Sequence, residues 1–534
     1  MNWPRLFKRK PKAVSPSAYF GGAQSNRLTE DWMASILSAD QELKGDLRAL
    51  RGRSRQMYRD DGLFHGLVTS LQNNVIGRRG MPQLQAKVKS TQGNLKVELN
   101  DMLEVGFQRW GHRDTCCADG QASWWELQRL VLATLWIDGE VFLRRLPGFG
   151  NRFGYALQMI DADLVDERYQ RYPTATQNAI RMGVEINEWG RPVAYYIWNA
   201  HPSDPFGKRR ERVRVPADEI IHVFVQWRTG QRRGIPVATP VMILSHMLDG
   251  YTQAEVMQAR AAAAGGGGFF EMTADAAEKM GIVNPTGDDI KKPLVMESEP
   301  VTARQLPIGW NFKEWNPTHP NQEFAPFQKA ITRVMARGVG FSYMTAAGDL
   351  SETSYSSGRI GLLDERDNYR VYQGFLEDRL NRPVYEDFVR YASLTGAVKL
   401  PTEDVERYFA HAWEWRGYPW VDLKNEIDAA AMELALRIQD RTSLCADRGR
   451  DVREVWENLQ REEALAAELG ITLPLVGVLT PRQLSEEDAS DTGPNSPPSS
   501  APAKPKAPPS MEKRAQTVAT ELDAVLGHGN GTHE

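Results

Sequence analysis

Hydrophobic and polar residues follow two periods along the chain, and the change between them predicts its elements. Between residues 63 and 110, apolar side chains recur every three or four positions, as on the buried faces of amphipathic helices. Gly77 stands where the C-cap of the first of these helices is expected. Ser123 and Glu126 have the spacing of a capping box, which predicts another helix that ends at the Asp138-Gly139 turn.

After this turn the period shortens to two, which is typical of strands. Five such segments are separated by Gly, Pro and Asp turns: residues 140–146, 155–160, 184–187, 193–198 and 220–225. The basic segment 207–214 lies between strands, and we interpret it as an exposed loop. Residues 20–225 are therefore expected to form one α+β unit.

A helix with marked ends is predicted next. A basic turn with Arg228, Arg232 and Arg233 leads into a proline-marked entry, a helical pattern over residues 236–262, and the glycines Gly265, Gly266, Gly267 and Gly268. Residues 269–310 are short mixed segments that suggest a small α/β module. Because the predicted helix ends abruptly at these glycines, we interpret it as an element whose geometry matters more than the chemistry of its side chains.

Helical patterning resumes at residues 324–339, breaks at 346–357, and continues from about 359 to 388. Two further helices are expected after Asp422 and after Asp451. From about residue 482 the composition is rich in Pro, Ser, Ala and Thr, which predicts a disordered linker. Residues 511–526 have one apolar helical face, typical of a frayed tail or of a peptide that folds on a partner.

Composition excludes several classes of protein. The 534 residues carry a net charge of −4, which argues against a protein whose main task is gripping phosphate. With three cysteines, we expect no disulfide framework. The sequence contains no run of 18 apolar residues, so we predict no membrane span. The basic N-terminal arm, residues 1–27, is expected to be solvated or to contact nucleic acid or a partner.

Motifs for catalysis are missing from the sequence, so we expect no catalytic residue, cofactor or metal. There is no GxxxxGK[ST] phosphate loop, HExxH zinc motif or GxSxG elbow. His112, Cys116 and Cys117 lack a second ligand pair and are interpreted as structural. A metal-dependent nucleic-acid-processing site built from Asp161, Asp163 and His222 stays open as an alternative, although turn acids and a core histidine explain these residues more simply.

Four blocks of sequence, in this order, resemble the lambda-type portal proteins of tailed bacteriophages. They are RSRQMYRDDGLFHGLVTSLQNNVIG at 53–77, IIHVFVQWRTGQRRGIPVATPV at 220–241, GDLSETSYSSGRIGLLDE at 348–365 and WEWRGYPWVDLKNE at 413–426. The resemblance runs from about residue 40 to 475. It implies a homo-oligomeric ring, dodecameric in the virion, at one capsid vertex.

Such a ring conducts double-stranded DNA during packaging and ejection. The resemblance implies as partners the terminase large subunit, the major capsid and scaffold proteins and the head–tail connector, with assembly in the bacterial host cytoplasm. A head–tail adaptor ring is a further alternative, against which the length of the chain argues.

The resemblance also implies a division of the chain. It comprises an arm (1–27), an α+β wing (28–235), a stem helix (236–262), a clip (263–310), a second stem helix with its connection (311–344), a tunnel loop (345–357), a long helix with a helical crown region (358–480) and a tail (481–534). The candidate DNA-contacting residues of the tunnel loop are Asp349, Ser351, Glu352, Thr353, Ser354 and Tyr355. The four glycines 265–268 are interpreted as a hinge between stem and clip. An ordinary solvent loop is the simpler interpretation of 345–357.

Overall fold

The computed structural model describes residues 35–90, 95–205, 210–263, 267–272, 310–315, 323–351, 354–401, 404–418 and 423–471. Contacts divide the chain into two units, Met1–Arg461 and Glu462–Glu534. The arm 1–27, the tail 481–534 and the predicted helix at 511–526 lie outside the described residues. None of the described helices is long and apolar enough to cross a membrane.

Helices dominate the first part of unit 1. They are α1 (Ala39–Asp60), α2 (Gly62–Val75), α3 (Val97–Trp110), α4 (Arg113–Cys116) and α5 (Trp124–Asp138). The capping box of α5 is confirmed: the Ser123 hydroxyl accepts from the Glu126 amide, and the Glu126 carboxylate accepts from the Ser123 amide. Gly77 follows the end of α2 with a φ of +80°, as predicted.

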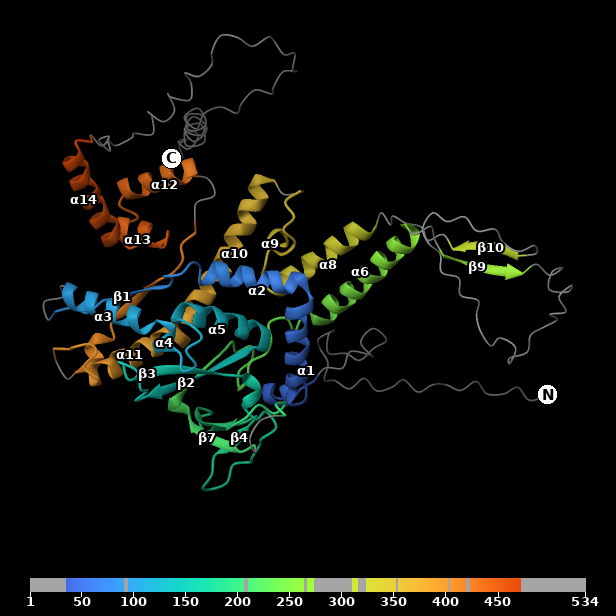
Figure 1. Ribbon diagram of the computed structural model, residues 1–534, viewed down its shortest axis with the longest axis horizontal. Coiled ribbons are helices and arrows are strands. Elements are labelled where there is room, and N and C mark those ends of the chain that lie inside the picture. The colour runs from blue at the N-terminus through green and yellow to red at the C-terminus, as the bar shows by residue number, and fades with distance from the viewer. Residues whose placement is uncertain are drawn as a thin grey trace, which may run out of the picture. The chain divides into compact units, whose positions relative to one another are not determined.

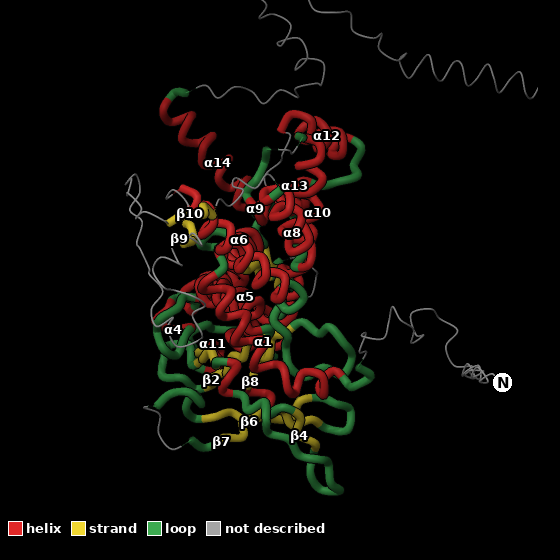
Figure 2. Tube along the Cα trace, turned by 90° about the vertical axis from the view of Figure 1, so that its right-hand side faces the viewer, coloured by secondary structure: helices red, strands yellow, loops and turns green. Residues whose placement is uncertain are grey.

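The strands of the described residues form four antiparallel sheets. A three-stranded sheet has the order β3-β2-β8, from Tyr155–Ile160, Glu140–Pro147 and Ile220–Phe224. A four-stranded sheet has the order β4-β5-β6-β7, from Ala179–Arg181, Val184–Ile186, Pro192–Trp198 and Arg212–Pro216. β1 (Gln83–Ala86) pairs with β11 (His411–Glu414), and β9 (Gly267–Met272) with β10 (Trp310–Trp315). Figure 2 shows β2, β8, β6, β7 and β4 gathered close to α1.

The interpretation of 207–214 as a loop is wrong for its C-terminal part, because Arg212 begins β7. Side chains from other segments hold the arginines of this edge strand in place. The Arg212 guanidinium lies 4.2 Å from the Tyr169 ring centroid, and Arg214 Nε donates to Glu185 at 2.9 Å. Charged side chains on an edge strand also protect it from pairing with other chains.

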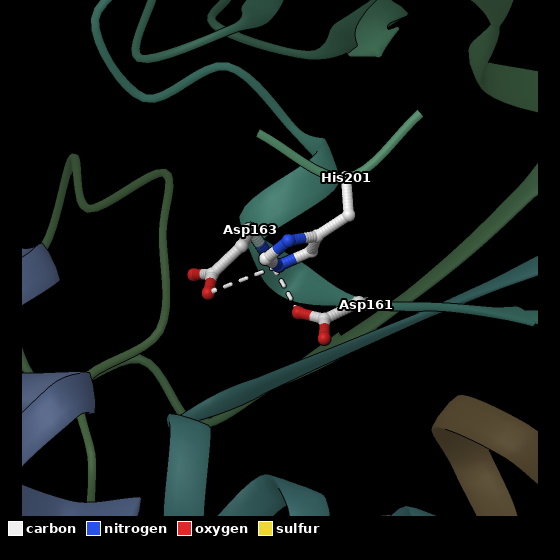
Figure 3. A group of neighbouring side chains, drawn as sticks. All are labelled: Asp161, Asp163 and His201. Carbon is white, nitrogen blue, oxygen red and sulfur yellow. Dashed lines mark hydrogen bonds and ion pairs between the residues drawn. The ribbon is translucent and has the colours of Figure 1, made fainter. Parts of the chain in front are cut away.

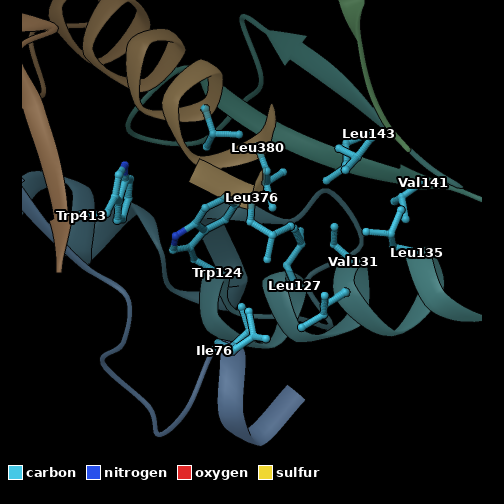
Figure 4. Packing of buried hydrophobic residues seen from close by; sticks show 14 of the residues in the cluster. Ile76, Trp124, Leu127, Val131, Leu135, Val141, Leu143, Leu376, Leu380 and Trp413 are labelled. Atoms are coloured by element: carbon cyan, nitrogen blue, oxygen red, sulfur yellow. The ribbon is translucent and has the colours of Figure 1, made fainter. Parts of the chain in front are cut away.

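The main core lies where α5 meets the end of α10 (Tyr355–Leu376) and the π-helical turn after it (Glu377–Asn381). Leu127, Val131 and Leu135 of α5 are at most 1% exposed. Figure 4 shows these side chains beside Leu376 and Leu380, which come from a segment more than 200 residues later. A second core cluster fills the space between the two larger sheets: Phe142, Ile160, Val184, Tyr195, Ile197 and Val215.

The predicted helix over 236–262 begins later than expected, as α6 (Met242–Ala263). Residues 236–241 form turns instead, in which the Thr239 hydroxyl donates to the Pro236 carbonyl at 2.7 Å. Pro236 and Pro240 explain the delay, because a proline disfavours helical backbone at the residue before it. Helix α8 (Phe324–Gly338) packs against α6 through Tyr251, whose ring centroid lies 5.2 Å from that of Phe327.

The glycine run divides after α6. Gly265 and Gly266 lie outside the described residues, whereas Gly267 and Gly268 belong to β9, where Gly268 pairs with Glu314 of β10. The hinge between stem and clip stays a prediction. Of the four glycines, Gly267 and Gly268 are strand residues. Figure 1 shows α6 and α8 side by side.

The rest of unit 1 is mainly helical. After α8 come α9 (Tyr343–Ala347), α10 (Tyr355–Leu376), a π-helical turn (Glu377–Asn381) and α11 (Arg382–Leu394). Helices α12 (Leu423–Ala435), α13 (Arg441–Ala446) and α14 (Val452–Leu469) follow; the last crosses the boundary between the units. The break predicted at 346–357 is shorter, because residues 346–347 end α9 and 355–357 begin α10.

Candidate functional site

The basic turn before α6 is anchored by a buried ion network centred on Glu140. This carboxylate is fully buried at the start of β2, where it accepts hydrogen bonds from Arg51 of α1 and from Arg233, both of which are at most 1% exposed. It also accepts from the Gly234 amide at 2.8 Å. Arg233 donates in addition to the carbonyls of Met182 (2.7 Å) and Ala162 (3.2 Å). The network therefore ties the turn to α1 and to both larger sheets.

Glu140 is ionised despite its burial. Burial by itself raises the pKa of a carboxyl group, but the guanidinium groups of Arg233 and Arg51 outweigh it and hold the pKa of Glu140 well below its usual range. His222 lies 3.1 Å from Glu140 through Nε2 and stacks on Phe142 at 4.1 Å. Burial lowers the pKa of His222, against the opposing effect of Glu140. The interpretation of His222 as a satisfied core histidine is confirmed.

Two glycines allow the turn to approach β2 closely. Gly139 has a φ of +85°, and a Cβ there would lie 2.3 Å from the carbonyl carbon of Ile235. A Cβ on Gly234 would lie 2.0 Å from the Gly139 oxygen. Any side chain at either position would push the two segments apart, and with them Glu140 and Arg233.

The other arginines of the turn also contact their own subunit. Arg228 pairs with Glu42 of α1 and donates to the Leu37 carbonyl at 3.3 Å. The Arg232 amide donates to Asp40 at 2.9 Å. All three arginines of the turn, Arg228, Arg232 and Arg233, therefore make contacts within their own chain.

The alternative metal site is not assembled as predicted, because His222 lies with Glu140 and not with Asp161 and Asp163. The histidine beside these two aspartates is His201, whose Nε2 lies 3.7 Å from Asp163 (Figure 3). Arg55 of α1 already supplies the positive charge, donating to Asp163 at 2.6 Å and to Asp161 at 3.1 Å. Asp161 also accepts from the Asp163 amide as a turn cap, which explains both acids without a metal.

Cys116 and Cys117 are buried thiols that serve packing. Burial raises the pKa of Cys116 to about 12 and that of Cys117 to about 11, so both are neutral thiols at neutral pH in the structure as it stands. Cys116 Sγ donates to the Ala122 carbonyl at 3.4 Å. No group of potential metal ligands among the described residues includes His112 or either cysteine.

The predicted tunnel loop begins from a turn that α10 holds rigidly. The buried Glu365 carboxylate of α10 accepts from the hydroxyls of Ser342 (2.7 Å) and Thr345 (2.8 Å) at the start of α9. Asn368 donates to the Gly340 carbonyl at 2.9 Å. Phe341 is buried between Trp136 and Tyr369. The segment before the loop is therefore fixed to the core.

Asp349 anchors the loop itself. Its carboxylate accepts from the Ser351 amide (2.9 Å) and hydroxyl (2.6 Å), and from the Tyr343 hydroxyl at 3.2 Å. Lys329 of α8 lies 3.5 Å from the same carboxylate. These hydrogen bonds, Ser351 first, and the positive charge of Lys329 hold the pKa of Asp349 well below its usual range.

The structure places the predicted residues of the tunnel loop in different surroundings. Asp349 and Ser351 are joined within one subunit, and Ser354 is exposed directly before α10. Tyr355 is the first residue of α10, so it belongs to the helix and not to a loop. Glu352 and Thr353 lie outside the described residues.

Sequence reasoning missed the residues that hold the loop, Lys329, Tyr343 and Glu365. They come from three different helices, and no spacing in the sequence relates a lysine on α8 to an aspartate twenty positions later. The serine at 342 was a detectable signal, since its hydroxyl caps α9 by accepting from the Thr345 amide.

Large apolar side chains are exposed on the helices around this turn. Those of α6, α8 and α10 that are at least 60% exposed are Ile243, Met247, Met257, Val334, Ile360 and Val371. An apolar surface of this kind on several neighbouring helices is typical of a protein–protein interface. The described part of the chain leaves these side chains exposed.

Comparison with known proteins identifies the family. Residues 25–373 match the family described as phage portal protein, lambda family. The chain is 33% identical over 460 residues to the probable portal protein of Halomonas phage phiHAP-1, covering 85% of this chain and 88% of that protein. It is 19% identical over 520 residues to portal protein B of Escherichia phage lambda, covering 88% and 95%.

Among solved structures, a chain in the neck of an empty GTA particle is 13% identical, with a TM-score of 0.37 over 76% of this chain and 93% of that one. The family match covers more than half of the sequence, and the phiHAP-1 relative aligns along most of both proteins. The chain belongs to the lambda family of phage portal proteins.

Proposed function

We propose that this chain is one subunit of a ring, dodecameric in the virion, that forms the DNA channel at one capsid vertex. DNA enters through the ring during packaging and leaves through it during ejection. The family match over residues 25–373 is the observation that carries this proposal. The exposed apolar faces of α6, α8 and α10 support it, because a ring of identical subunits needs two different faces that meet head to tail.

The segment from Gly348 to Ser354 is proposed to face the DNA. Its only described acid, Asp349, is neutralised by Lys329 in the same subunit, so it would not repel a duplex as an unpaired carboxylate would. Hydroxyl groups such as those of Ser351 and Ser354 can contact phosphates without the affinity of an ion pair. Such contacts add little to the affinity for DNA, because ionic contacts to phosphates supply most of it.

The partners of the ring are proposed by family membership. They are the terminase large subunit, which would dock during packaging, the major capsid and scaffold proteins, and the head–tail connector. The ring would assemble in the host cytoplasm and remain in the virion. We assign it no chemical step, because Arg55 already neutralises the acids of the alternative metal site.

Deleting residues 349–354 tests the role of the loop. We expect rings and thermal stability to persist, because Glu365 and Asn368 fix the preceding turn without the loop. Packaging, or retention of packaged DNA, should fall at least about tenfold, measured as full heads per infected cell.

Replacing the same six residues by glycine and serine is the matched control, since it keeps the length of the loop. If this variant packages DNA normally while the deletion variant does not, the length of the loop matters more than its side chains. Normal yields of full heads from the deletion itself would refute a role in the channel.

A further inference from the structure

Six arginines line one groove of about 880 Å³ in unit 1. They come from four segments that are far apart in the sequence: the turn after α2, helix α5, the chain after β11, and the turn after α13. The arginines are Arg78, Arg79, Arg129, Arg416, Arg448 and Arg450. No described aspartate or glutamate lines this groove.

Neutral groups hold two of these arginines in place. Arg416 donates to the Asn73 carbonyl at 2.7 Å and to the Asn74 side-chain oxygen. Arg129 donates to the Asn73 side-chain oxygen at 3.0 Å and lies 5.2 Å from the Trp125 ring centroid. Amide oxygens orient a guanidinium group but leave its charge uncompensated, which is the arrangement of a binding site and not of an ion pair.

Glycines let the arginine-bearing segments meet. A Cβ on Gly77 would lie 2.8 Å from the Arg416 Cδ atom. A Cβ on Gly417 would lie 2.2 Å from the Arg448 carbonyl carbon. These two close approaches bring the positive charges of the α2, β11 and α13 segments onto one surface.

The acids nearest to these arginines have other partners. Asp451 accepts from the Gln85 side chain at 2.7 Å and from the Arg453 amide at 2.6 Å. Asp447 accepts from Gln439 at 3.2 Å. Glu126 feels the charge of Arg79, but its carboxylate is held by Ser123 in the capping box. The lining of the groove itself therefore contains guanidinium groups and no described carboxylate.

We propose that this groove binds the phosphate backbone of double-stranded DNA, without regard to sequence. The groove is too large for one phosphate group, so the ligand carries several charges. A guanidinium group matches the geometry of phosphate oxygens with two parallel hydrogen bonds, and Arg is enriched wherever phosphates are recognised. The choice of DNA over another polyanion rests on the proposed function, which brings a duplex to the ring.

The proposal also refines the inference from net charge. A chain with a net charge of −4 is not basic as a whole, and its main task is not to grip phosphate. Six arginines in one groove nevertheless create a local positive potential. Contacts of this kind are strongly weakened by salt, and a duplex can still slide along them.

The salt dependence of DNA binding tests the proposal with the full-length chain. A fluorescent 30-base-pair duplex serves as the probe, and anisotropy gives its Kd at several salt concentrations. The groove variant combines Arg78→Gln, Arg79→Gln and Arg450→Gln, three exposed positions. We expect the slope of log Kd against log salt to fall by about 2–3, and affinity at about 0.1 M salt to fall at least about tenfold.

The control removes the same charge elsewhere, through Arg53→Gln, Arg152→Gln and Arg168→Gln, also exposed positions. Thermal unfolding checks that both variants fold. The control should lower the slope by less than about 1. Equal losses in the two variants would mean that only the overall charge matters, and would overturn the groove.

Poly-glutamate distinguishes an acidic protein from DNA as the ligand. If the groove variant loses poly-glutamate binding but keeps duplex binding, the proposal is wrong. Negative-stain images of the same samples separate this inference from the proposed function. If the samples form rings but the groove variant binds the duplex as tightly as the unmodified chain, only the groove is refuted. If the groove variant weakens duplex binding but no rings are seen, only the portal ring is refuted.

Discussion

Two arginine-rich places in this molecule differ in how their charges are matched. Around Glu140, two buried arginines share one buried carboxylate; Arg51 also pairs with Asp163, and Arg233 donates to backbone carbonyls. The lining of the groove between α2, α5 and α13 holds six arginines and no described carboxylate. Matched charge fixes the fold, whereas unmatched charge at a surface is available to a ligand.

Removing the matched carboxylate should have the largest effect. Glu140→Gln would leave the buried Arg233 without its carboxylate partner, and Arg51 with only Asp163 at 3.5 Å and Glu167 at 3.8 Å, so we expect the free energy of unfolding to fall by about 3–5 kcal/mol. Chemical denaturation of the variant measures this loss.

The pair between Arg144 and Glu219 is the matched control, because its partners lie 2.8 Å apart but are about one third exposed. Glu219→Gln should cost at most about 1 kcal/mol. Similar midpoints for Glu140→Gln and the unmodified chain would show that the buried network does not hold the wing together.

A smaller effect on the free energy of unfolding is expected from a change at Glu414 of β11, a carboxylate outside the Glu140 network. Burial, and then the nearby charge of Asp451, raise the pKa of Glu414 from its ordinary value of about 4.5 to about 7. The folded protein therefore binds a proton that the unfolded chain releases, and stability falls as the pH rises from about 4.5 to 7. Glu414→Gln should stabilise the protein by roughly 1–2 kcal/mol at pH 8 and hardly at all at pH 4.

Thermal or chemical unfolding at the two pH values checks this prediction. The difference between the variant and the unmodified chain must grow with pH, because only the ionised carboxylate is penalised. A stabilisation that is equal at pH 4 and pH 8 would mean that packing, and not ionisation, explains it.

Local signals predicted much of the fold. The capping box of α5, the glycine after α2 and the alternation in β2, β3 and β6 each lie within a few residues of the element that they specify. Helix α1 was missed because its buried side includes Arg51 and Ser54, polar residues where an apolar period is expected. Strand β7 was missed because its arginines find partners in other parts of the chain: Arg212 packs on Tyr169 and Trp198, and Arg214 pairs with Glu185.

The sites were harder to predict than the elements. The acids of the alternative metal site were found, but their histidine was misassigned, since pairing of β2 with β8 places His222 beside Glu140. The arginine groove had no local signal at all. Its six members come from residues 78 to 450, and only the tertiary fold brings them together.

Negative-stain electron microscopy of the purified full-length chain tests the central claim most directly. If the chain is a portal subunit, the particles are rings with a central hole wide enough for a duplex. A uniform population of compact monomers under the same conditions would contradict the account.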